Sequence, residues 1–397
     1  MKYRLLEFLK EPSTEEEFEV EVFESCQLSR NIEIKHVRCN QWCHKNNTSP
    51  LLINKHECNS CYTLEIISGK LTSKQTKVEY PIIKGVPRIL PLDILKDTLE
   101  KNYSDFLEKF EEKFSFKFNL KIKSENKNKN IINSFSYQWT TFINNYDHFK
   151  DIFLSFTKPF LKEEDFKNKI MLEVGCGSGR PAVTACKMGA EVIGMDISRA
   201  VDSAYIQSEK IAMLHIVQAD AYAPPFKQKF DVVYSVGVLQ HIPSPQKALE
   251  GIRTTLSEVS PLILWVYGER ELWYKPIELF RKISVKLPHK LLHAISILLA
   301  ILSELFLLIP YRVMSKISAL DKISKKVPGR IYARFPFREN VVGWFDRLSA
   351  PVTYYFNQEY IHSLLDKTGY SNIEIAARKN ASASWVIRAT RNRKKKV

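Results

Sequence analysis

The sequence predicts an α/β fold built on a parallel sheet, and three features of the 397-residue chain indicate it. Short apolar segments alternate with helical patterns over residues 166–268, as parallel strands joined by crossover helices do. Residues 1–95 are strand-rich and carry a cluster of cysteines, and residues 269–370 are mostly helical. We therefore expect a small N-terminal α+β module (1–95), a helical linker (96–165) and an α/β domain (166–397) that contains the helical insertion.

The chain is basic, with a formal net charge of +15, but many of its lysines are scattered among asparagines and isoleucines. This charge suits an anionic partner, either nucleic acid or an acidic membrane surface, and selects neither. The first residues form no apolar core of the signal-peptide type, and the cysteines are grouped like metal ligands rather than a disulfide framework. We expect a cytoplasmic protein, with or without contact to the inner face of the membrane.

A glycine-rich turn follows the first strand of the α/β domain. Residues 170–174 have the pattern of a buried strand, and Gly175, Gly177 and Gly179 lead from it into a helix. Glycines at this point let the backbone turn tightly and approach a ligand closely at a helix N-terminus. The pattern alone would also suit a dinucleotide site, but Arg180 occupies the position of that motif's final glycine.

Acidic residues follow the next two strands. Asp196 ends the second strand, 21 residues after Gly175, where a carboxylate can accept hydrogen bonds from both hydroxyls of a ribose. The third strand, expected over residues 214–218, leads to Asp220 and Ala221. An acid at that position can accept a hydrogen bond from the exocyclic amine of adenine.

This order of loop and acids resembles the class I (Rossmann-like) methyltransferases, with a match over residues 166–268. The resemblance implies a seven-stranded, mostly parallel Rossmann-like sheet with helices on both faces, and S-adenosylmethionine as the cofactor. It also implies that the glycine loop holds the amino-acid side of the cofactor, Asp196 its ribose and Asp220 its adenine. The expected cofactor-binding residues are Glu173, Gly175, Gly177, Gly179, Asp196, Asp220, Ala221, Ser235, Tyr137 and Trp139.

In that family the segment after the fourth strand, expected here over residues 230–235, normally faces the methyl group. In this chain the segment extends to His241 and lacks the Asn/Asp-Pro-Pro-Tyr type of motif used for amino groups on nucleobases or glutamine. It resembles the corresponding stretch of small-molecule methyltransferases, including those of quinone biosynthesis. We therefore expect an oxygen or carbon acceptor, with His241 as the base that removes its proton. The alternative is a histidine that only packs or hydrogen-bonds locally.

Two segments outside the sheet are expected to reach the same site. The segment containing Tyr137 and Trp139 resembles a short aromatic segment that closes over the cofactor in some of these enzymes; an amphipathic helix packed on the sheet is the alternative. Asp346, Tyr354 and Tyr355 lie where the insertion returns to the pocket, and we expect them to contact the acceptor, with ordinary loop polarity as the alternative.

Four cysteines of the N-terminal module form the pairs Cys39-x3-Cys43 and Cys58-x2-Cys61, separated by 14 residues. Two such pairs can supply a tetrahedral structural zinc site; buried or free thiols are the alternative. Residues 80–88 resemble the zinc-ribbon family of methyltransferase activator subunits, which implies a zinc-ribbon-like fold. That family has a cysteine pair just before this segment and this chain has none there, so its four cysteines would form a separate site.

The centre of the insertion, residues 291–310, is strongly apolar, but Glu304 and His293 interrupt it, so we do not expect it to cross a bilayer fully. Lysines flank it on both sides. An apolar helix with basic flanks suits a bilayer interface or a lipid-bearing substrate. A lid helix buried against the α/β domain is the alternative.

These features favour a methyltransferase acting on an oxygen or carbon of a small molecule, with lipid- or glycan-linked molecules among the candidates. An RNA methyltransferase with an N-terminal zinc ribbon is the alternative that the positive charge would suit. The basic residues, however, are dispersed and do not alternate with aromatics as a base-stacking surface requires. A non-catalytic scaffold that binds S-adenosylmethionine is the third hypothesis, and the two acids of the expected site argue against it.

Overall fold

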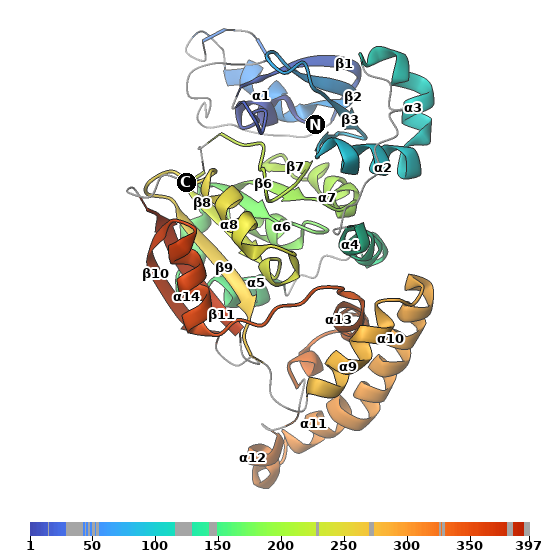
Figure 1. The fold of residues 1–397 in the computed structure, drawn as a ribbon. Coiled ribbons are helices and arrows are strands. Elements are labelled where there is room, and N and C mark those ends of the chain that lie inside the picture. The colour runs from blue at the N-terminus through green and yellow to red at the C-terminus, as the bar shows by residue number, and fades with distance from the viewer. Residues whose placement is uncertain are drawn as a thin grey trace.

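The computed structural model is shown in Figure 1. It describes residues 1–14, 16–28, 43, 45–46, 48–49, 52, 55–115, 129–142, 149–227, 230–269, 274–324, 327, 330–378 and 384–392.

A mixed sheet of eleven strands forms the centre of the molecule, in the order β1-β2-β3-β4-β7-β6-β5-β8-β9-β11-β10. Neighbouring strands from β7 to β9 pair in parallel, and the last two strands pair antiparallel. The seven strands predicted for the α/β domain are present as β5 (Ile170–Val174), β6 (Glu191–Asp196), β7 (Leu214–Ala219), β8 (Val232–Val236), β9 (Pro261–Tyr267), β10 (Tyr370–Ala377) and β11 (Ser384–Arg391). The prediction of seven strands was too low for the sheet as a whole, because four N-terminal strands extend it.

The N-terminal strands continue the same sheet. They are β1 (Phe18–Gln27), β2 (Leu64–Ser73), β3 (Glu79–Ile83) and β4 (Val86–Ile89), paired antiparallel in that order. Strand β4 then pairs in parallel with β7, with Arg88 opposite Gln218 and Ile89 opposite Ala219. Residues 1–95 therefore share backbone hydrogen bonds with the α/β domain and are not a separately packed module.

A buried polar cluster strengthens this junction. Arg4 donates from Nε and Nη2 to the two carboxylate oxygens of Glu191, over 2.9 and 3.3 Å. The Tyr62 hydroxyl donates to the same carboxylate over 3.2 Å, and Nε2 of His215 lies 3.1 Å from it. Because buried charges are tolerated only when paired and hydrogen-bonded, this cluster fixes the N-terminal helix η1 (Tyr3–Glu7) against the sheet.

Helices cover both faces of the α/β sheet, as predicted. Alternate residues of β5 point to opposite faces, so Leu172 joins one apolar cluster and Met171 another. On the Leu172 face lie α8 (Pro245–Arg253) and α14 (Gln358–Lys367), and on the Met171 face lie α5 (Phe149–Thr157), α6 (Arg180–Lys187) and α7 (Ala200–Ser208). The remaining helices before the domain are α1 (Lys55–Thr63), α2 (Leu92–Asn102), α3 (Ser104–Phe110) and α4 (Lys129–Thr141).

The insertion between β9 and β10 is helical and lies at the opposite end of the molecule from the N-terminal strands (Figure 1). Its elements before α14 are α9 (Lys275–Ser284), α10 (His289–Ser303), the π-helix η7 (Glu304–Leu308), α11 (Ile309–Met314), η8 (Ser318–Leu320), α12 (Asp321–Ser324), η9 (Arg330–Arg334) and α13 (Phe337–Ser349). Helix α13 packs on α10 around Leu292, Ala300 and Phe345. This third apolar cluster also includes Phe142, directly after α4, so the insertion contacts the segment that precedes the domain.

Candidate active site

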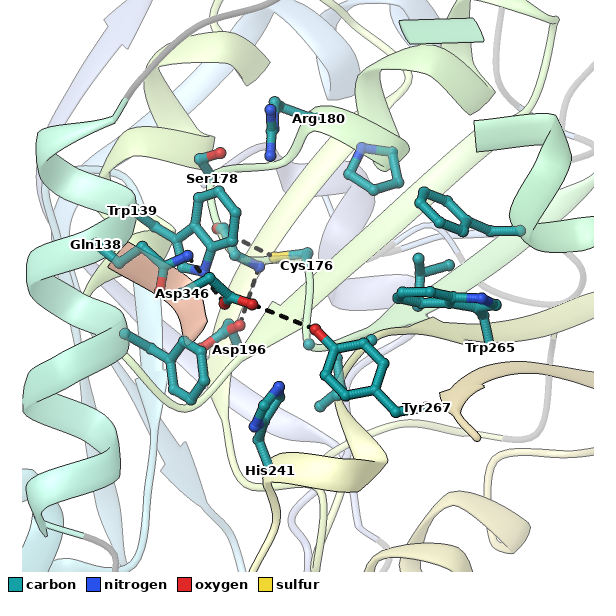
Figure 2. Close-up of a pocket in the computed structure, with 18 of the residues that line it drawn as sticks. Gln138, Trp139, Cys176, Ser178, Arg180, Asp196, His241, Trp265, Tyr267 and Asp346 are labelled. Atoms are coloured by element: carbon teal, nitrogen blue, oxygen red, sulfur yellow. Dashed lines mark hydrogen bonds between the residues drawn. The ribbon is translucent and has the colours of Figure 1, made fainter. Parts of the chain in front are cut away.

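A cavity of about 700 Å³ lies where β5, β6, β7 and β8 end, between the sheet, α4 and the insertion. The carboxyl ends of parallel strands are where α/β folds bind ligands, because the loops that follow diverge there. The domain supplies one side of this cavity and the insertion supplies the other, so residues distant in sequence face a common space (Figure 2).

The glycine loop forms the floor of the cavity. Gly175, Gly177 and Gly179 have φ angles of 79°, 52° and 83°, a region that side chains disfavour. A Cβ on Gly175 would lie 2.3 Å from the Val238 side chain, and one on Gly177 would lie 3.3 Å from Nε1 of Trp139. The loop then enters α6, whose first N–H groups form a site that favours anionic groups.

Asp196 ends β6 at the cavity wall and is held by two backbone donors. The N–H of Gly177 donates to Oδ2 over 2.9 Å and the N–H of Ser198 donates to Oδ1 over 2.8 Å. Burial raises the pKa of Asp196 although these bonds oppose the rise. Each carboxylate oxygen still has a lone pair for a ligand hydroxyl. The structure thus places the predicted ribose acceptor beside the predicted loop.

Asp220 and Ala221 line the cavity next to Asp196, after β7. The Tyr222 N–H donates to Oδ1 of Asp220 over 2.9 Å, which orients the carboxyl, and burial raises its pKa. Glu173 also lines the cavity; burial raises its pKa well above the usual value, and the Tyr234 hydroxyl donates to Oε2 over 3.3 Å.

Ser235 is the exception among the predicted cofactor residues of the domain. Its hydroxyl donates to the Val174 carbonyl over 2.8 Å, and the side chain does not line the cavity. The expectation that Ser235 contacts the cofactor is therefore corrected, since the hydroxyl instead ties β8 to β5. Its neighbour Val236 lines the cavity in its place.

The aromatic segment is part of α4, and its two predicted cofactor residues, Tyr137 and Trp139, point to different places. Trp139 lines the cavity over the glycine loop, with the Arg180 guanidinium 5.0 Å from its ring centroid. Tyr137 instead stacks on His289 and Phe345 of the insertion, at 5.0 and 5.5 Å between ring centroids. The cofactor role predicted for Tyr137 is corrected to packing against the insertion, because its side chain leaves α4 on another face.

His241 points into the cavity towards Asp346 and Tyr267 (Figure 2). Its Nδ1 lies 2.8 Å from the Val352 carbonyl oxygen. Because a carbonyl only accepts hydrogen bonds, Nδ1 carries the proton, and Nε2 of the neutral ring has a free lone pair. Burial lowers the pKa of His241, so the ring is neutral at pH 7. Its position and its tautomer both suit a base.

Of the predicted acceptor residues, only Asp346 lines the cavity. Its Oδ1 accepts from Nε2 of Gln138 over 3.2 Å and its Oδ2 accepts from the Tyr267 hydroxyl over 3.2 Å. Tyr354 turns outward and donates to the Pro243 carbonyl, so its predicted contact with the acceptor is corrected. Tyr355 lies behind the wall, with its ring 6.4 Å from that of Tyr267, and that prediction is corrected as well.

Several cavity residues were missed by the sequence interpretation. Trp265 and Tyr267 lie at the carboxyl end of β9 and line the cavity. Their position at the end of a buried strand could have indicated this. Gln138 lies between Tyr137 and Trp139 in the sequence, and its buried Oε1 has no hydrogen-bond partner in the part of the chain that the structure describes. The insertion and the last strands add arginines whose placement depends on tertiary packing, namely Arg281, Arg330, Arg347 and Arg378.

Three of the four predicted zinc ligands, Cys43, Cys58 and Cys61, belong to the described part of the N-terminal region, and none of the three lines this cavity. Cys43 and Cys61 are buried with Tyr62 in a small apolar cluster, and Cys58 is half-buried. Within the described ranges, no group of three or more His, Cys, Asp or Glu side chains could hold a metal ion. Cys39 lies outside those ranges, so the four-cysteine site stays a prediction.

The segment that builds the cavity floor matches a known family. A family model described as a methyltransferase domain covers residues 172–263, which include Glu173, the glycine loop, both carboxylates and His241. The segment is therefore similar to methyltransferase domains, and the glycine loop and both carboxylates of the cavity lie inside the matched range.

Curated proteins that resemble the chain are named as methyltransferases. Over 96 residues the chain is 28% identical to the ubiquinone biosynthesis O-methyltransferase of Hydrogenovibrio crunogenus, covering 23% of this chain and 39% of that protein. Over 81 residues it is 37% identical to the enzyme of the same name from Thiobacillus denitrificans, covering 19% of this chain and 35% of that protein. The chain thus spans less than half the length of these relatives.

Solved structures resemble the chain only loosely. A methyltransferase of Thermotoga maritima, described as a possible histamine N-methyltransferase, has a TM-score of 0.36 at 16% identity, covering 64% of this chain and 99% of that one. A phosphoethanolamine N-methyltransferase of Haemonchus contortus, solved with S-adenosylhomocysteine, has a TM-score of 0.36 at 17% identity, covering 65% and 56%.

Proposed function

We propose that this chain is an S-adenosylmethionine-dependent methyltransferase that transfers a methyl group to an oxygen or carbon of a small-molecule acceptor. The observation that carries the proposal is the convergence, in one cavity, of a left-handed glycine loop, the carboxylate of Asp196 and the unprotonated Nε2 of His241. A cavity that binds only a nucleotide would not need a neutral base beside the acceptor space.

The residues of the floor fit this cofactor. The glycine loop leaves room that side chains would fill. The buried Ser178 hydroxyl beside it has no hydrogen-bond partner among the described residues and can donate to a carboxylate. Asp196 can accept from ribose hydroxyls and Asp220 from the adenine amine. S-adenosylmethionine, when bound, supplies a methyl group on a positively charged sulfur.

The acceptor side is arranged for proton removal. A hydroxyl held near His241 can donate its hydrogen bond to Nε2, and Nε2 takes the proton as the acceptor oxygen attacks. The imidazolium that forms is stabilised by the Val352 carbonyl on Nδ1–H and by the negative charge of Asp346. Gln138 and Tyr267 hold Asp346 in place for this role.

A panel of acceptors with tritiated S-adenosylmethionine tests the activity. We expect radioactivity in an organic extract when phenols, catechols or lipid-linked hydroxyl compounds are supplied, and loss of that signal in the His241→Gln variant. If label enters only added RNA, or if no class of acceptor is labelled although S-adenosylmethionine binds, the proposal fails.

We propose in addition that the insertion rests on a membrane surface. Large apolar side chains of α9, α10, η7 and α11 are exposed, with Leu279 at 65% and Phe306 at 72%. The exposed lysines nearest them in sequence are Lys282, Lys286, Lys290 and Lys316. Within the described residues, His289–Met314 is long and apolar enough to cross a membrane, with 28% of its most apolar window buried. Basic side chains beside an apolar face favour a leaflet with anionic headgroups.

Co-sedimentation with vesicles tests this surface. We expect the chain to pellet with phosphatidylglycerol vesicles and less with phosphatidylcholine vesicles, and Phe306→Asp with Leu302→Asp to abolish pelleting. Val259→Asp is the matched control, since Val259 is an equally apolar side chain with 79% exposure, close to the start of β9. Equal pelleting of the parent, the control and the double variant would refute membrane contact.

A further inference from the structure

Acidic and basic side chains both line the cavity. The strand ends contribute the acidic residues Glu173, Asp196 and Asp220. The insertion contributes the acids Glu339 and Asp346 and the bases Arg281, Arg330 and Arg347, while Arg180 begins α6 and Arg378 follows β10. The acids at the strand ends suit the ammonium group, the ribose and the adenine amine of the cofactor. Three of the arginines, Arg281, Arg347 and Arg378, are here called the basic wall and are left for the second substrate.

Arg347 is held on α13 without a hydrogen-bond acceptor among the residues that the structure describes. Its guanidinium lies 4.9 Å from the ring centroid of Tyr332 and 5.3 Å from that of Trp344. Neighbouring tyrosines and the carboxylate of Asp346 raise the pKa of Arg347 against the effect of burial, but Asp346 accepts its hydrogen bonds from Gln138 and Tyr267. An arginine placed on aromatic faces keeps its planar N–H donors available for an incoming anion.

Arg378, directly after β10, also packs on an aromatic ring. Its Nε and Nη2 donate to the Ser155 hydroxyl, over 3.1 and 2.7 Å, and its guanidinium lies 4.3 Å from the ring centroid of Phe156. Burial lowers the pKa of Arg378 to about 10, so it remains charged at pH 7. It makes no ion pair with any carboxylate in the described part of the chain.

Arg281 completes the set from α9. Its Nη1 donates to the Tyr355 hydroxyl over 3.3 Å, and its positive charge adds to burial in lowering the pKa of His241. By contrast, Arg180 on the sheet side is paired with Glu339 at 3.0 Å. Half-buried guanidinium groups without carboxylate partners are costly unless an anion neutralises them, and a carboxylate or phosphate matches their forked donors.

We infer that Arg281, Arg347 and Arg378 form an oxyanion subsite for the acceptor, which therefore carries a carboxylate or a phosphate. This inference rests on the proposed function, because it assigns the basic wall to the acceptor of that reaction. The subsite fixes one end of the acceptor, and the aromatic wall of Trp265 and Tyr267 lies beside its body. The nucleophilic atom then faces Nε2 of His241.

Calorimetry with three matched aromatic probes tests the subsite, each titrated into the chain saturated with S-adenosylhomocysteine. Phenyl phosphate and benzoate carry the two candidate anions, and benzamide is the neutral analogue. We expect at least one anionic probe to bind at least tenfold more tightly than benzamide. Tighter binding of phenyl phosphate would indicate a phosphate on the acceptor, and tighter binding of benzoate a carboxylate; equal affinity for all three probes would overturn the inference.

Variants connect the anion to the arginines. Arg347→Met and Arg378→Met should each weaken binding of the preferred anion at least tenfold and leave the affinity for benzamide unchanged. Arg347→Lys should lose less affinity, because lysine keeps the positive charge and lacks only the forked N–H donors of arginine. Arg388→Met, on β11 with an exposed pair to Glu374, is the control. Unchanged S-adenosylhomocysteine affinity shows that each variant is folded. Anion binding that survives in both methionine variants would refute the subsite, whereas failure of S-adenosylhomocysteine to bind the parent would refute the proposed function instead.

Discussion

The backbone N–H of Gly177 donates a hydrogen bond to Oδ2 of Asp196 over 2.9 Å. This bond joins the loop after the first strand of the domain to the carboxylate that ends the second. The two parts of the expected nucleoside site therefore have a fixed relative position before any ligand arrives. Preorganisation of this kind reduces the ordering cost of binding.

Asp196→Ala should weaken binding of S-adenosylhomocysteine by about 1.5–3 kcal/mol, or roughly 10- to 150-fold, because it removes a charged acceptor and the anchor of Gly177. Isothermal titration calorimetry measures the change. Asp231→Ala is the control, since Asp231 also accepts a backbone N–H, that of Ile170 over 2.8 Å, but does not line the cavity. Equal affinity in both variants would show that Asp196 is not the ribose acceptor.

Gly177→Ala should cost both stability and cofactor affinity. Its φ of 52° disfavours a side chain, and the new Cβ would lie 3.3 Å from the Trp139 ring. Gly189→Ala, at φ 97° and away from the cavity, should cost a comparable amount of stability, about 1 kcal/mol, and no affinity. Thermal unfolding together with titration of S-adenosylhomocysteine separates the two effects. Parallel losses of affinity in both variants would contradict the assignment.

The rate of methyl transfer should follow the protonation of His241. Burial lowers its pKa below the usual value, so the basic form persists at pH 6.5 and is lost only as the pH falls further. We expect kcat/KM to decline on the acid side below pH 6.5, and His241→Gln to lose about 10²- to 10⁴-fold in kcat with unchanged cofactor affinity. His362→Gln, on the exposed face of α14, is the control. A parent profile without any decline of kcat/KM on the acid side before the chain unfolds would exclude this base.

Stability should fall on acidification because of His215. Burial lowers the pKa of this histidine from 6.5 to about 4, so the folded chain binds its proton less readily than the unfolded chain. The contribution of a neutral His215 is therefore complete above pH 6.5 and is lost as the pH falls towards 4. Replacing His215 by Gln should make the free energy of unfolding less dependent on pH over that window, by on the order of 2 kcal/mol. Urea titrations at pH 7 and 4.5 measure this, and an equal pH dependence in both proteins would argue against it.

The sheet side of the site could be predicted because each of its residues has a local signal. Gly175 and Asp196 follow buried strands at characteristic positions, and the structure places both at the cavity. The prediction for Ser235 was wrong because successive side chains of a strand point in opposite directions. An error of one position therefore selects a side chain that faces the protein interior and not the cavity.

The basic side of the site could not be predicted in the same way. Arg347 lies inside a helix of the insertion and Arg378 at the end of a late strand, and only tertiary packing brings them to one cavity. Nothing in a 13-residue helix such as α13 distinguishes an arginine facing a pocket from one facing solvent. The pairing of β4 with β7 escaped prediction for a related reason, since no local pattern specifies which strand edge a distant segment will extend.

Crystals of the chain soaked with S-adenosylhomocysteine test the central claim most directly. We predict electron density for the nucleoside in the cavity, with the ribose hydroxyls within hydrogen-bond distance of Asp196, adenine beside Asp220 and the amino-acid part over Gly177. Density elsewhere on the chain, or a cavity that stays empty at millimolar ligand, would contradict the account.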